Sequence, residues 1–247
     1  MVIWLVLAIL LVVVMVALLG CARVTIPRRA SAEGIEDPSA AQAYNRISQW
    51  PQFKFLRRMI VGEIRKCHPE GIMVDVGCGP GYLVAAMAKS FPHLHIIGAD
   101  IANEMVQLAS KNLSSLSFGE QVEFRQGDIQ ALPFDDNAVD FVVSTFSLHH
   151  WSEPSHSLKE IHRVLKPGGQ FLIFDLRRDA RRFFYWLLGF AQTFVVPTPI
   201  RSINEPTGSA RSSYTPVEAE AFLSDIPWQQ YRIKPGIAWM FIWGQKD

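Results

Sequence analysis

Short apolar runs rich in β-branched residues alternate with helical stretches over more than a hundred residues of the chain. The runs that predict strands are Ile72 to Val76, His95 to Asp100, Val122 to Arg125, Phe141 to Ser144 and Phe171 to Phe174. The stretches that predict helices between them are Tyr82 to Ser90, Asn103 to Asn112 and Ser155 to Leu165. Because strands alternating with helices are joined by right-handed crossovers, this order predicts a parallel sheet covered on both faces.

The segments before this alternation have different patterns. Residues 24–40 contain prolines, Gly34 and several Ser and Ala residues without an apolar period, which predicts a linker. From Gln42 the pattern becomes helical, with apolar side chains at spacings of three and four that include Ile60 and Ile64. The expected organisation is an anchor over residues 1–21, a linker over 22–41 and one α/β domain over 42–247.

After Asp175 the alternation stops. A basic and aromatic stretch leads into a Pro-rich loop, and Thr215 then begins a helix with Pro216 in its first turn and Glu218 three residues on. The chain ends in two apolar segments around Pro235-Gly236, which predicts a hairpin.

The first apolar run, Val2 to Leu19, contains no charged residue. As a helix it would extend about 27 Å, close to the thickness of a thin bilayer, and it lacks the polar stripe of a buried core helix. The run therefore predicts one transmembrane helix. Arg23, Arg28 and Arg29 follow it, so we expect a single-pass protein with the globular part on the cytoplasmic face.

A second interpretation of this region is a lipoprotein signal. Leu18-Leu19-Gly20-Cys21 resembles a lipoprotein cleavage box, and Cys21 would then carry the lipid. A secretory signal has a basic region before its apolar core, and none is present here. Export would also separate the domain from the cofactor inferred below.

Composition narrows the classes of function. The chain has 24 Lys and Arg against 23 Asp and Glu, a net charge of +1, which gives no general attraction to nucleic acid. The three cysteines, Cys21, Cys67 and Cys78, show neither metal-ligand spacing nor the even count of a disulfide framework. We therefore expect no metal, no nucleic-acid partner and a reducing compartment.

A glycine-dense turn follows the first strand and precedes a helix. Gly77, Gly79 and Gly81 lie in the stretch Val74-Asp75-Val76-Gly77-Cys78-Gly79-Pro80-Gly81-Tyr82. Glycines allow a sharp bend and close approach of a ligand to the main chain. A dinucleotide fingerprint, G-x-G-x-x-G, would need its third glycine at position 82, where Tyr82 stands, so a nicotinamide enzyme is disfavoured.

Asp100 ends the second strand about twenty residues after the glycines. In nucleotide-binding α/β folds an acidic residue at this offset accepts hydrogen bonds from ribose hydroxyls. A lone aspartate at a strand end is otherwise a helix cap. Together with the glycine turn, Asp100 predicts a ribose site.

Further motifs follow in register: Gly127-Asp128-Ile129, Ala131-Leu132-Pro133-Phe134, Asp140-Phe141-Val142, Leu148-His149-His150-Trp151 and Val164-Leu165-Lys166-Pro167-Gly168-Gly169. With Asp75 to Gly81 and Asp100 they resemble the class I S-adenosylmethionine-dependent methyltransferases, especially the branch that methylates quinones, sterols and other small molecules. The resemblance covers about Tyr44 to Gly169 well and the carboxyl third in outline. It implies a Rossmann-like, seven-stranded, mostly parallel sheet with a terminal antiparallel hairpin.

The resemblance also implies roles in binding S-adenosylmethionine. Asp75 would organise the methionine amino group, and Asp100 would bind the ribose. Asp128 would accept from the adenine amino group, although it also suits a turn after Gly127. The remaining positions implied are Gly77, Cys78, Gly79 and Gly81 in the turn, Ile129 beside the adenine, Ser144 near the methionine moiety and Tyr44 as an amino-terminal lid.

His149 and His150 are the candidate catalytic bases. They follow the fourth strand, at the carboxyl edge where open α/β sheets bind ligands. An imidazole with a pKa near 6.5 suits an acceptor that must lose a proton, whereas local packing of a His-His-Trp turn is the alternative. Lys166-Pro167-Gly168-Gly169 predicts a structural helix stop and turn into the fifth strand.

One segment stands apart from the methyltransferase motifs. Arg177, Arg178, Arg181 and Arg182 precede an apolar, aromatic run from Phe183 to Val196 that is too short to span a bilayer. It is either an ordinary helix between strands or an interfacial element, with arginines on lipid phosphates and aromatic rings at the acyl boundary. In the interfacial element, the rings at the acyl boundary would be Phe183, Phe184, Tyr185, Trp186 and Phe190.

The sequence thus predicts methyl transfer from S-adenosylmethionine to a small, apolar acceptor at a membrane, such as a quinone, sterol, lipid, phenol or thiol. The alternative is a membrane-tethered module that binds S-adenosylmethionine without catalysis. Alignment of the reacting groups can lower the activation barrier by up to about 7–11 kcal/mol, so few catalytic side chains are needed.

Overall fold

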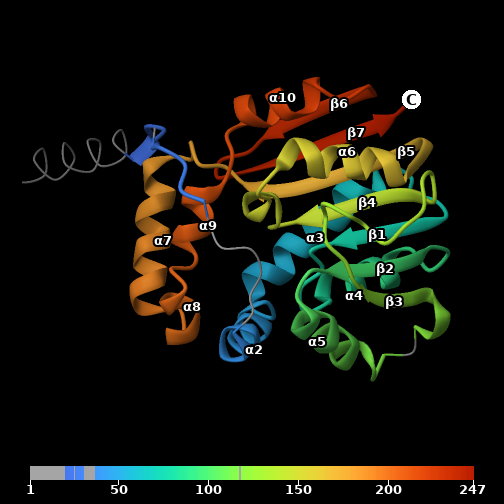
Figure 1. Ribbon diagram of the computed structural model, residues 1–247. Helices are drawn as coiled ribbons and strands as arrows, with labels where there is room; N and C mark the ends of the chain where they lie inside the picture. The colour runs from blue at the N-terminus through green and yellow to red at the C-terminus, as the bar shows by residue number, and fades with distance from the viewer. Residues whose placement is uncertain (1–19, 25, 31–36, 117) are drawn as a thin grey trace, which may run out of the picture.

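A central sheet with helices on both faces organises the computed structural model, which describes residues 20–24, 26–30, 37–116 and 118–247 (Figure 1). Its strands are β1 (Ile72–Val76), β2 (His95–Asp100), β3 (Val122–Gln126), β4 (Val139–Thr145), β5 (Leu165–Leu176), β6 (Trp228–Pro235) and β7 (Trp239–Lys246). The helices are α2 (Pro38–Ile47), α3 (Pro51–Arg65), α4 (Tyr82–Ser90), α5 (Asn103–Leu113), α6 (Pro154–Val164), α7 (Arg182–Phe194), α8 (Thr198–Ser202), α9 (Thr207–Ser212) and α10 (Pro216–Ser224), with short 3-10 turns η1 (Gly119–Gln121) and η2 (Leu148–His150).

The seven described strands lie in the order β3-β2-β1-β4-β5-β7-β6. The first five are parallel, β7 is antiparallel to β5, and β6 is antiparallel to β7. This arrangement confirms the mostly parallel sheet and the terminal hairpin. The strand order reverses between β1 and β4, and a ligand site is expected at the carboxyl ends of the strands on either side of such a switch point.

Side chains of opposite parity on the strands form two separate cores. Val74, Ile97 and Val142 pack on one face with α6 and α10. Met73, Ile96 and Phe141 pack on the other face with α3 and α4. Because both faces of β1, β2 and β4 are buried, these strands are mostly apolar, whereas the edge strand β3 alternates apolar and polar residues.

The turn predicted at Lys166–Gly169 lies inside a strand. Helix α6 ends at Val164, and β5 already begins at Leu165. Leu165 pairs with Val139 and Gln170 with Phe141, so Lys166 to Gly169 form an irregularity within the β4–β5 pairing. Gly168 has a φ of +78°, which favours glycine. The motif therefore has a structural role, as expected. The predicted start of the fifth strand at Phe171 was wrong, because β5 begins at Leu165.

The predicted linker over residues 22–41 is also corrected. Asp37 caps α2 by accepting a hydrogen bond from the Ala40 N–H at 2.7 Å, so helix begins at Pro38. Residues 20–24 and 26–30 contact the carboxyl third of the chain, with the Val24 N–H bonded to the Ala180 carbonyl at 3.1 Å. Hydrogen bonds from its backbone and side chains hold this part of the chain against the domain.

Helices α7, α8 and α9 form a group beside the carboxyl ends of the parallel strands (Figure 1). Arg177 and Arg178, which the interfacial hypothesis assigned to lipid phosphates, are buried. Arg177 forms a two-point ion pair with Asp179, and Arg178 bonds Glu218 at 2.6 Å and the Ser213 carbonyl at 2.7 Å. These two arginines join segments of the protein, which corrects that part of the hypothesis.

The predicted transmembrane helix, Val2 to Leu19, lies outside the described residues. Within the part of the chain that the structure describes, no helix is long and apolar enough to cross a membrane. The carboxyl-terminal predictions are confirmed, since α10 has the capping box between Thr215 and Glu218 and the β6–β7 hairpin turns after Pro235.

Candidate functional site

The glycine turn lies at the switch point between β1 and β4. A side chain at position 77 would place its Cβ only 2.7 Å from the Ser147 hydroxyl oxygen, on the segment that follows β4. At position 81 a Cβ would lie 2.9 Å from the Ala109 Cβ on α5. Gly77 and Gly81 also have φ values of +73° and +80°. Glycine is thus required at both positions by conformation and by space.

The turn is fastened to β2 by its backbone. The Gly77 and Cys78 N–H groups donate to the Ala99 carbonyl at 2.8 and 3.0 Å. The Gly79 N–H donates to Oδ2 of Asp100 at 2.8 Å, while the Ala102 N–H donates to Oδ1 at 3.0 Å. Asp100 therefore holds the turn and the residue just before α5, and burial raises the pKa of Asp100. The structure brings Asp100 and the glycine turn together as the sequence predicted.

Asp75 has an unusual environment for an acidic side chain. Its side chain is 1% exposed, and neither carboxylate oxygen has a hydrogen-bond partner among the described residues. Burial, and then the charge of Asp100, raise the pKa of Asp75 to about 8. A buried carboxylate without a partner is costly, so the site is chemically suited to a cationic ligand group. The ammonium of S-adenosylmethionine is such a group, and the residues fit this cofactor.

Tyr44 lies over the glycine turn. A Cβ at position 79 would approach the Tyr44 ring to 3.7 Å, which is ordinary contact. Burial raises the pKa of Tyr44 to about 12, and the charges of Glu205 and Asp100 act in the same direction. Its helix is tied to α4 because the Tyr82 hydroxyl donates to Asn45 at 3.0 Å. Tyr82, the residue that breaks the dinucleotide pattern, thus positions α2.

The other predicted cofactor residues make different kinds of contact. The Cys78 thiol is buried, which raises its pKa well above the usual value. Ser144 is fully buried and its hydroxyl donates to the Val76 carbonyl at 2.8 Å, a bond between β4 and β1. Asp128 accepts from the Gln130 N–H at 2.9 Å, the turn geometry that was its alternative. Ile129 packs against the core beside it.

The two candidate histidines differ in their surroundings. His149 is 2% exposed, and its Nδ1 lies 2.8 Å from Oδ1 of Asp175 at the end of β5. The His149 N–H donates to the second oxygen of the same carboxylate at 2.8 Å. Its Nε2 is buried without a hydrogen-bond partner among the described residues. His150 is half-buried, with its ring 4.1 Å from the His149 ring.

The His149–Asp175 pair sets the protonation of the imidazole. Burial lowers the pKa of His149, but the adjacent Asp175 carboxylate more than compensates, and the pKa is raised above its usual value. Because a carboxylate only accepts, Nδ1 carries the hydrogen toward Asp175. In the neutral ring this leaves the lone pair of Nε2 free to accept a proton.

Two residues of this region were not selected from the sequence. Asp175 ends a parallel strand, and that position was a usable signal. Phe146 follows β4 with a φ of +54°, a strained conformation for an aromatic residue, and no sequence pattern indicates it. Its ring meets Phe53 and Phe174 edge to face, at 6.3 and 5.1 Å between centroids. These rings form an apolar cluster at the carboxyl edge of the sheet, in which Phe174 is buried.

A surface cavity of about 530 Å³ lies elsewhere, beside the amino ends of β1 and β2. Ile72, His95 and Arg125 are among its lining residues, and none of the predicted site residues lines it. The candidate site is therefore defined by the unpartnered polar groups at the carboxyl edge rather than by this cavity. Among the described residues no cluster of His, Cys, Asp and Glu could hold a metal ion.

Comparison with known proteins agrees with this geometry. Residues 74–173 match the family model described as a methyltransferase domain. An uncharacterized methyltransferase of Bacillus subtilis is 34% identical over 111 residues, which cover 44% of this chain and 42% of that protein. A demethylmenaquinone methyltransferase of Lactobacillus johnsonii is 36% identical over 103 residues, covering 41% of this chain and 42% of that protein. Both matches thus span less than half of the relative.

The fold comparison covers more of the chain. A putative S-adenosylmethionine-dependent methyltransferase from Methanococcus maripaludis superposes with a TM-score of 0.68 at 23% identity, covering 88% of this chain and 97% of that one. Residues 74–173 are thus similar in sequence to a methyltransferase domain, and the chain shares its fold with that solved protein.

Proposed function

We propose that this protein transfers a methyl group from S-adenosylmethionine to a small, apolar acceptor that loses a proton in the reaction. The observation that carries the proposal is the buried His149–Asp175 pair, whose free Nε2 lies at the same sheet edge as the cofactor residues. A base held in this way is useful where the acceptor must be deprotonated.

S-adenosylmethionine supplies a sulfonium-activated methyl group when it is bound. Asp75 would hold its ammonium, since that carboxylate is buried without a partner. Asp100 would accept from the ribose hydroxyls, and the backbone of Gly77 and Gly79 would lie beneath the ligand, where larger residues are excluded by the positive φ angles.

Asp175 would act as a positioning residue, and His149 as the base. The carboxylate orients the imidazole through Nδ1 and favours the imidazolium that forms when Nε2 accepts the acceptor's proton. The acceptor gains the methyl group as it loses that proton. Since the pKa of His149 is raised, transfer of a proton from a phenol or quinol to it is less unfavourable than to an ordinary histidine.

The acceptor class follows from the surroundings and from one relative. Phe53, Phe146 and Phe174 form an apolar cluster where β4 and β5 end, at the sheet edge that also carries the base. The relative from Lactobacillus johnsonii is named for demethylmenaquinone. We favour a quinol or phenol as acceptor, with sterols, other lipids and thiols as alternatives within the same chemistry.

The cellular location is part of the same proposal. The charge-free run Val2 to Leu19 and the arginines at 23, 28 and 29 support a single-pass protein with its catalytic domain on the cytoplasmic face. An acceptor dissolved in the bilayer would then be close to the enzyme.

The test is incubation of membranes containing the full chain with methyl-labelled S-adenosylmethionine and a panel of quinols, phenols, sterols and thiols. Label in an extracted quinol or phenol is the expected result, with far less label for His149→Ala. The second candidate, a tethered module that binds S-adenosylmethionine without catalysis, predicts cofactor binding but no labelled product for any acceptor.

A further inference from the structure

Helix α7 exposes a continuous apolar face. Phe183, Trp186, Leu187, Phe190 and Phe194 recur at helical spacings of three and four, and their side chains are between 46% (Trp186) and 74% (Phe194) exposed. No residue of α7 is buried. A contiguous apolar surface of this kind marks a site of interaction, whereas isolated exposed apolar residues are common. We refer to these five residues as the α7 face.

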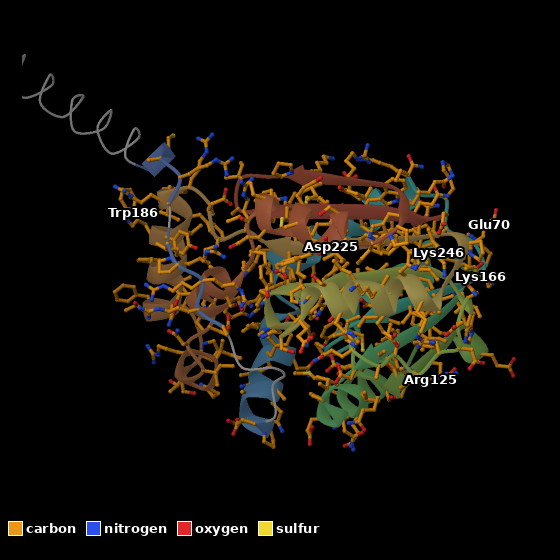
Figure 2. The ribbon with its side chains drawn as sticks, turned by 45° about the horizontal axis from the view of Figure 1, so that its top comes forward. Glu70, Arg125, Lys166, Trp186, Asp225 and Lys246 are labelled. Atoms are coloured by element: carbon orange, nitrogen blue, oxygen red, sulfur yellow. The ribbon has the colours of Figure 1, made fainter. Side chains whose placement is uncertain are left out.

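The opposite side of α7 is fastened to the protein. The Tyr185 hydroxyl donates to the Arg178 carbonyl at 2.8 Å and to the Ala210 carbonyl at 3.1 Å. Gln192 bonds Asn204 at 3.1 Å. The helix is thereby held with the α7 face outward. Figure 2 shows Trp186 at the end of the molecule farthest from Glu70, Lys166 and Lys246, which mark the amino-terminal edge of the parallel strands.

The surroundings of the α7 face are strongly basic. Residues 20–30 and 177–214 together contain nine arginines against two carboxylates, Asp179 and Glu205. Although Arg177 and Arg178 are buried, six of these arginines are exposed: Arg23, Arg29, Arg181, Arg182, Arg201 and Arg211. Neither of the two carboxylates is fully exposed. An apolar helix face beside exposed arginines is complementary to an anionic lipid surface.

The amino-terminal apolar run joins the described chain at this place. A Cβ at Gly20 would lie 3.4 Å from the Phe183 Cβ and 3.5 Å from the Trp186 ring. The Arg182 N–H donates to the Ala22 carbonyl at 2.8 Å, and the backbones of Arg23 and Arg181 form an isolated antiparallel β-bridge. Gly20, the residue that follows the charge-free sequence Val2 to Leu19, therefore lies directly beside the α7 face.

We propose that the α7 face is a second membrane contact, which lies in the interface of an anionic bilayer beside the amino-terminal anchor. As a helix of 13 residues α7 is about 20 Å long, too short to cross the hydrocarbon core but suited to lie along its surface. Covalent continuity with the anchor gives the face a high effective concentration at the lipid, so a weak contact suffices.

This contact would place the candidate site next to the bilayer. Ile200 of α8 packs with Ala43 and Ile47 of α2, the helix that carries Tyr44. Arg28 bonds both the Ser212 carbonyl at 2.6 Å and the His149 carbonyl at 3.2 Å. The α7–α9 group thus connects the lipid contact to the residues around the base. The contact itself does not depend on the proposed reaction.

The test uses the full chain in vesicles of phosphatidylcholine and phosphatidylglycerol that contain a lipid with a photoactivatable group on its acyl chain. After illumination, mass spectrometry locates the lipid adducts. We expect adducts on residues 183–194 as well as on the amino-terminal run. Phe55, Val217 and Ile237 are similarly exposed apolar residues on α3, α10 and the β6–β7 turn, and they serve as internal controls that should carry none.

Charge variants test the arginine contribution. Arg181→Gln with Arg182→Gln should lower the yield of α7 adducts several-fold, whereas Lys54→Gln with Arg58→Gln, both exposed on α3, should leave it unchanged. Adducts confined to residues 2–19, or α7 cross-linked to the amino-terminal run or to a second copy of the chain, would overturn the proposal. Each result can be read without any measurement of activity.

Discussion

Nδ1 of His149 lies 2.8 Å from Oδ1 of Asp175, and both side chains are almost completely buried. The two residues are 26 positions apart, and they meet because β4 and β5 are adjacent parallel strands whose carboxyl ends share one edge. The carboxylate also accepts the His149 N–H. The imidazole is therefore fixed in position and orientation before any ligand binds.

Removal of the proposed base should reduce turnover with little effect on cofactor binding. For His149→Ala we expect kcat to fall by about 10²–10⁴-fold, the range for a lost general base. His150→Ala is the matched control, since its ring lies beside that of His149 but is outside the Asp175 pair. Steady-state kinetics with a quinol or phenol give the measurement. Equal losses in the two variants would point to local packing of the turn instead.

The pH dependence of kcat should report the pair. Only neutral His149 can accept a proton, so activity should rise as pH increases through a pKa above 6.5, the ordinary value. In Asp175→Asn the charge that raises this pKa is gone while burial remains, so the rise should move to lower pH and the maximal kcat should fall. A pH–rate profile of each protein tests this. An unchanged midpoint in Asp175→Asn would exclude His149 as the titrating group.

In the absence of cofactor, Asp75 should lower the stability of the fold as pH rises from about 4 to about 8. Its folded-state pKa of about 8 exceeds the ordinary value of 3.8, so its contribution to stability is present below pH 4 and is lost as pH rises toward 8. Asp75→Asn should remove this loss. Its free energy of unfolding relative to wild type should therefore rise by at least about 1 kcal/mol from pH 5 to pH 8. Urea unfolding of the full chain in detergent at both pH values measures it.

The same Asp75→Asn substitution should weaken binding of S-adenosylmethionine by about 1.5–3 kcal/mol, because the ligand ammonium loses a charged partner. Greater stability with weaker binding is the combination expected of a ligand-binding group. If affinity were retained, the ammonium would have another partner in the protein.

The segment before α2 should stabilise the domain. Arg28 bonds the carbonyls of Ser212 and His149, and its guanidinium lies 4.1 Å from the centre of the Tyr214 ring. Arg28→Gln should therefore cost about 1–3 kcal/mol. Arg29→Gln, at an exposed neighbour, should cost almost nothing. A chain shortened to begin at Ala30 should lose at least as much stability as Arg28→Gln. Equal urea midpoints for all of these proteins would show that residues 22–30 act only as a linker.

Much of the sheet and the cofactor turn could be predicted because they depend on local pattern. The β-branched runs located β1 to β5, and the glycine spacing with Asp100 located the turn. The pairing of His149 with Asp175 could not be predicted in the same way, because it depends on the register of β4 against β5. The register in turn contains the irregularity at Lys166–Gly169.

Composition was a poor guide to the arginine-rich segment for a similar reason. Four arginines in six residues suggested one charged surface, yet Arg177 and Arg178 turn inward to Asp179 and Glu218. Which arginines remain exposed is decided by carboxylates that fold against them. The left-handed backbone of Phe146 has no sequence signal at all, since aromatic residues rarely adopt it.

Calorimetric titration of the full chain with S-adenosylmethionine tests the central claim most directly. We expect saturable binding of S-adenosylmethionine and no detectable binding of NADH. Asp100→Asn should bind about 1.5–3 kcal/mol less tightly, because the ribose hydroxyls lose a charged acceptor while one oxygen remains for the Gly79 N–H. Tight binding of NADH together with no binding of S-adenosylmethionine would contradict the assignment of this site to methyl transfer.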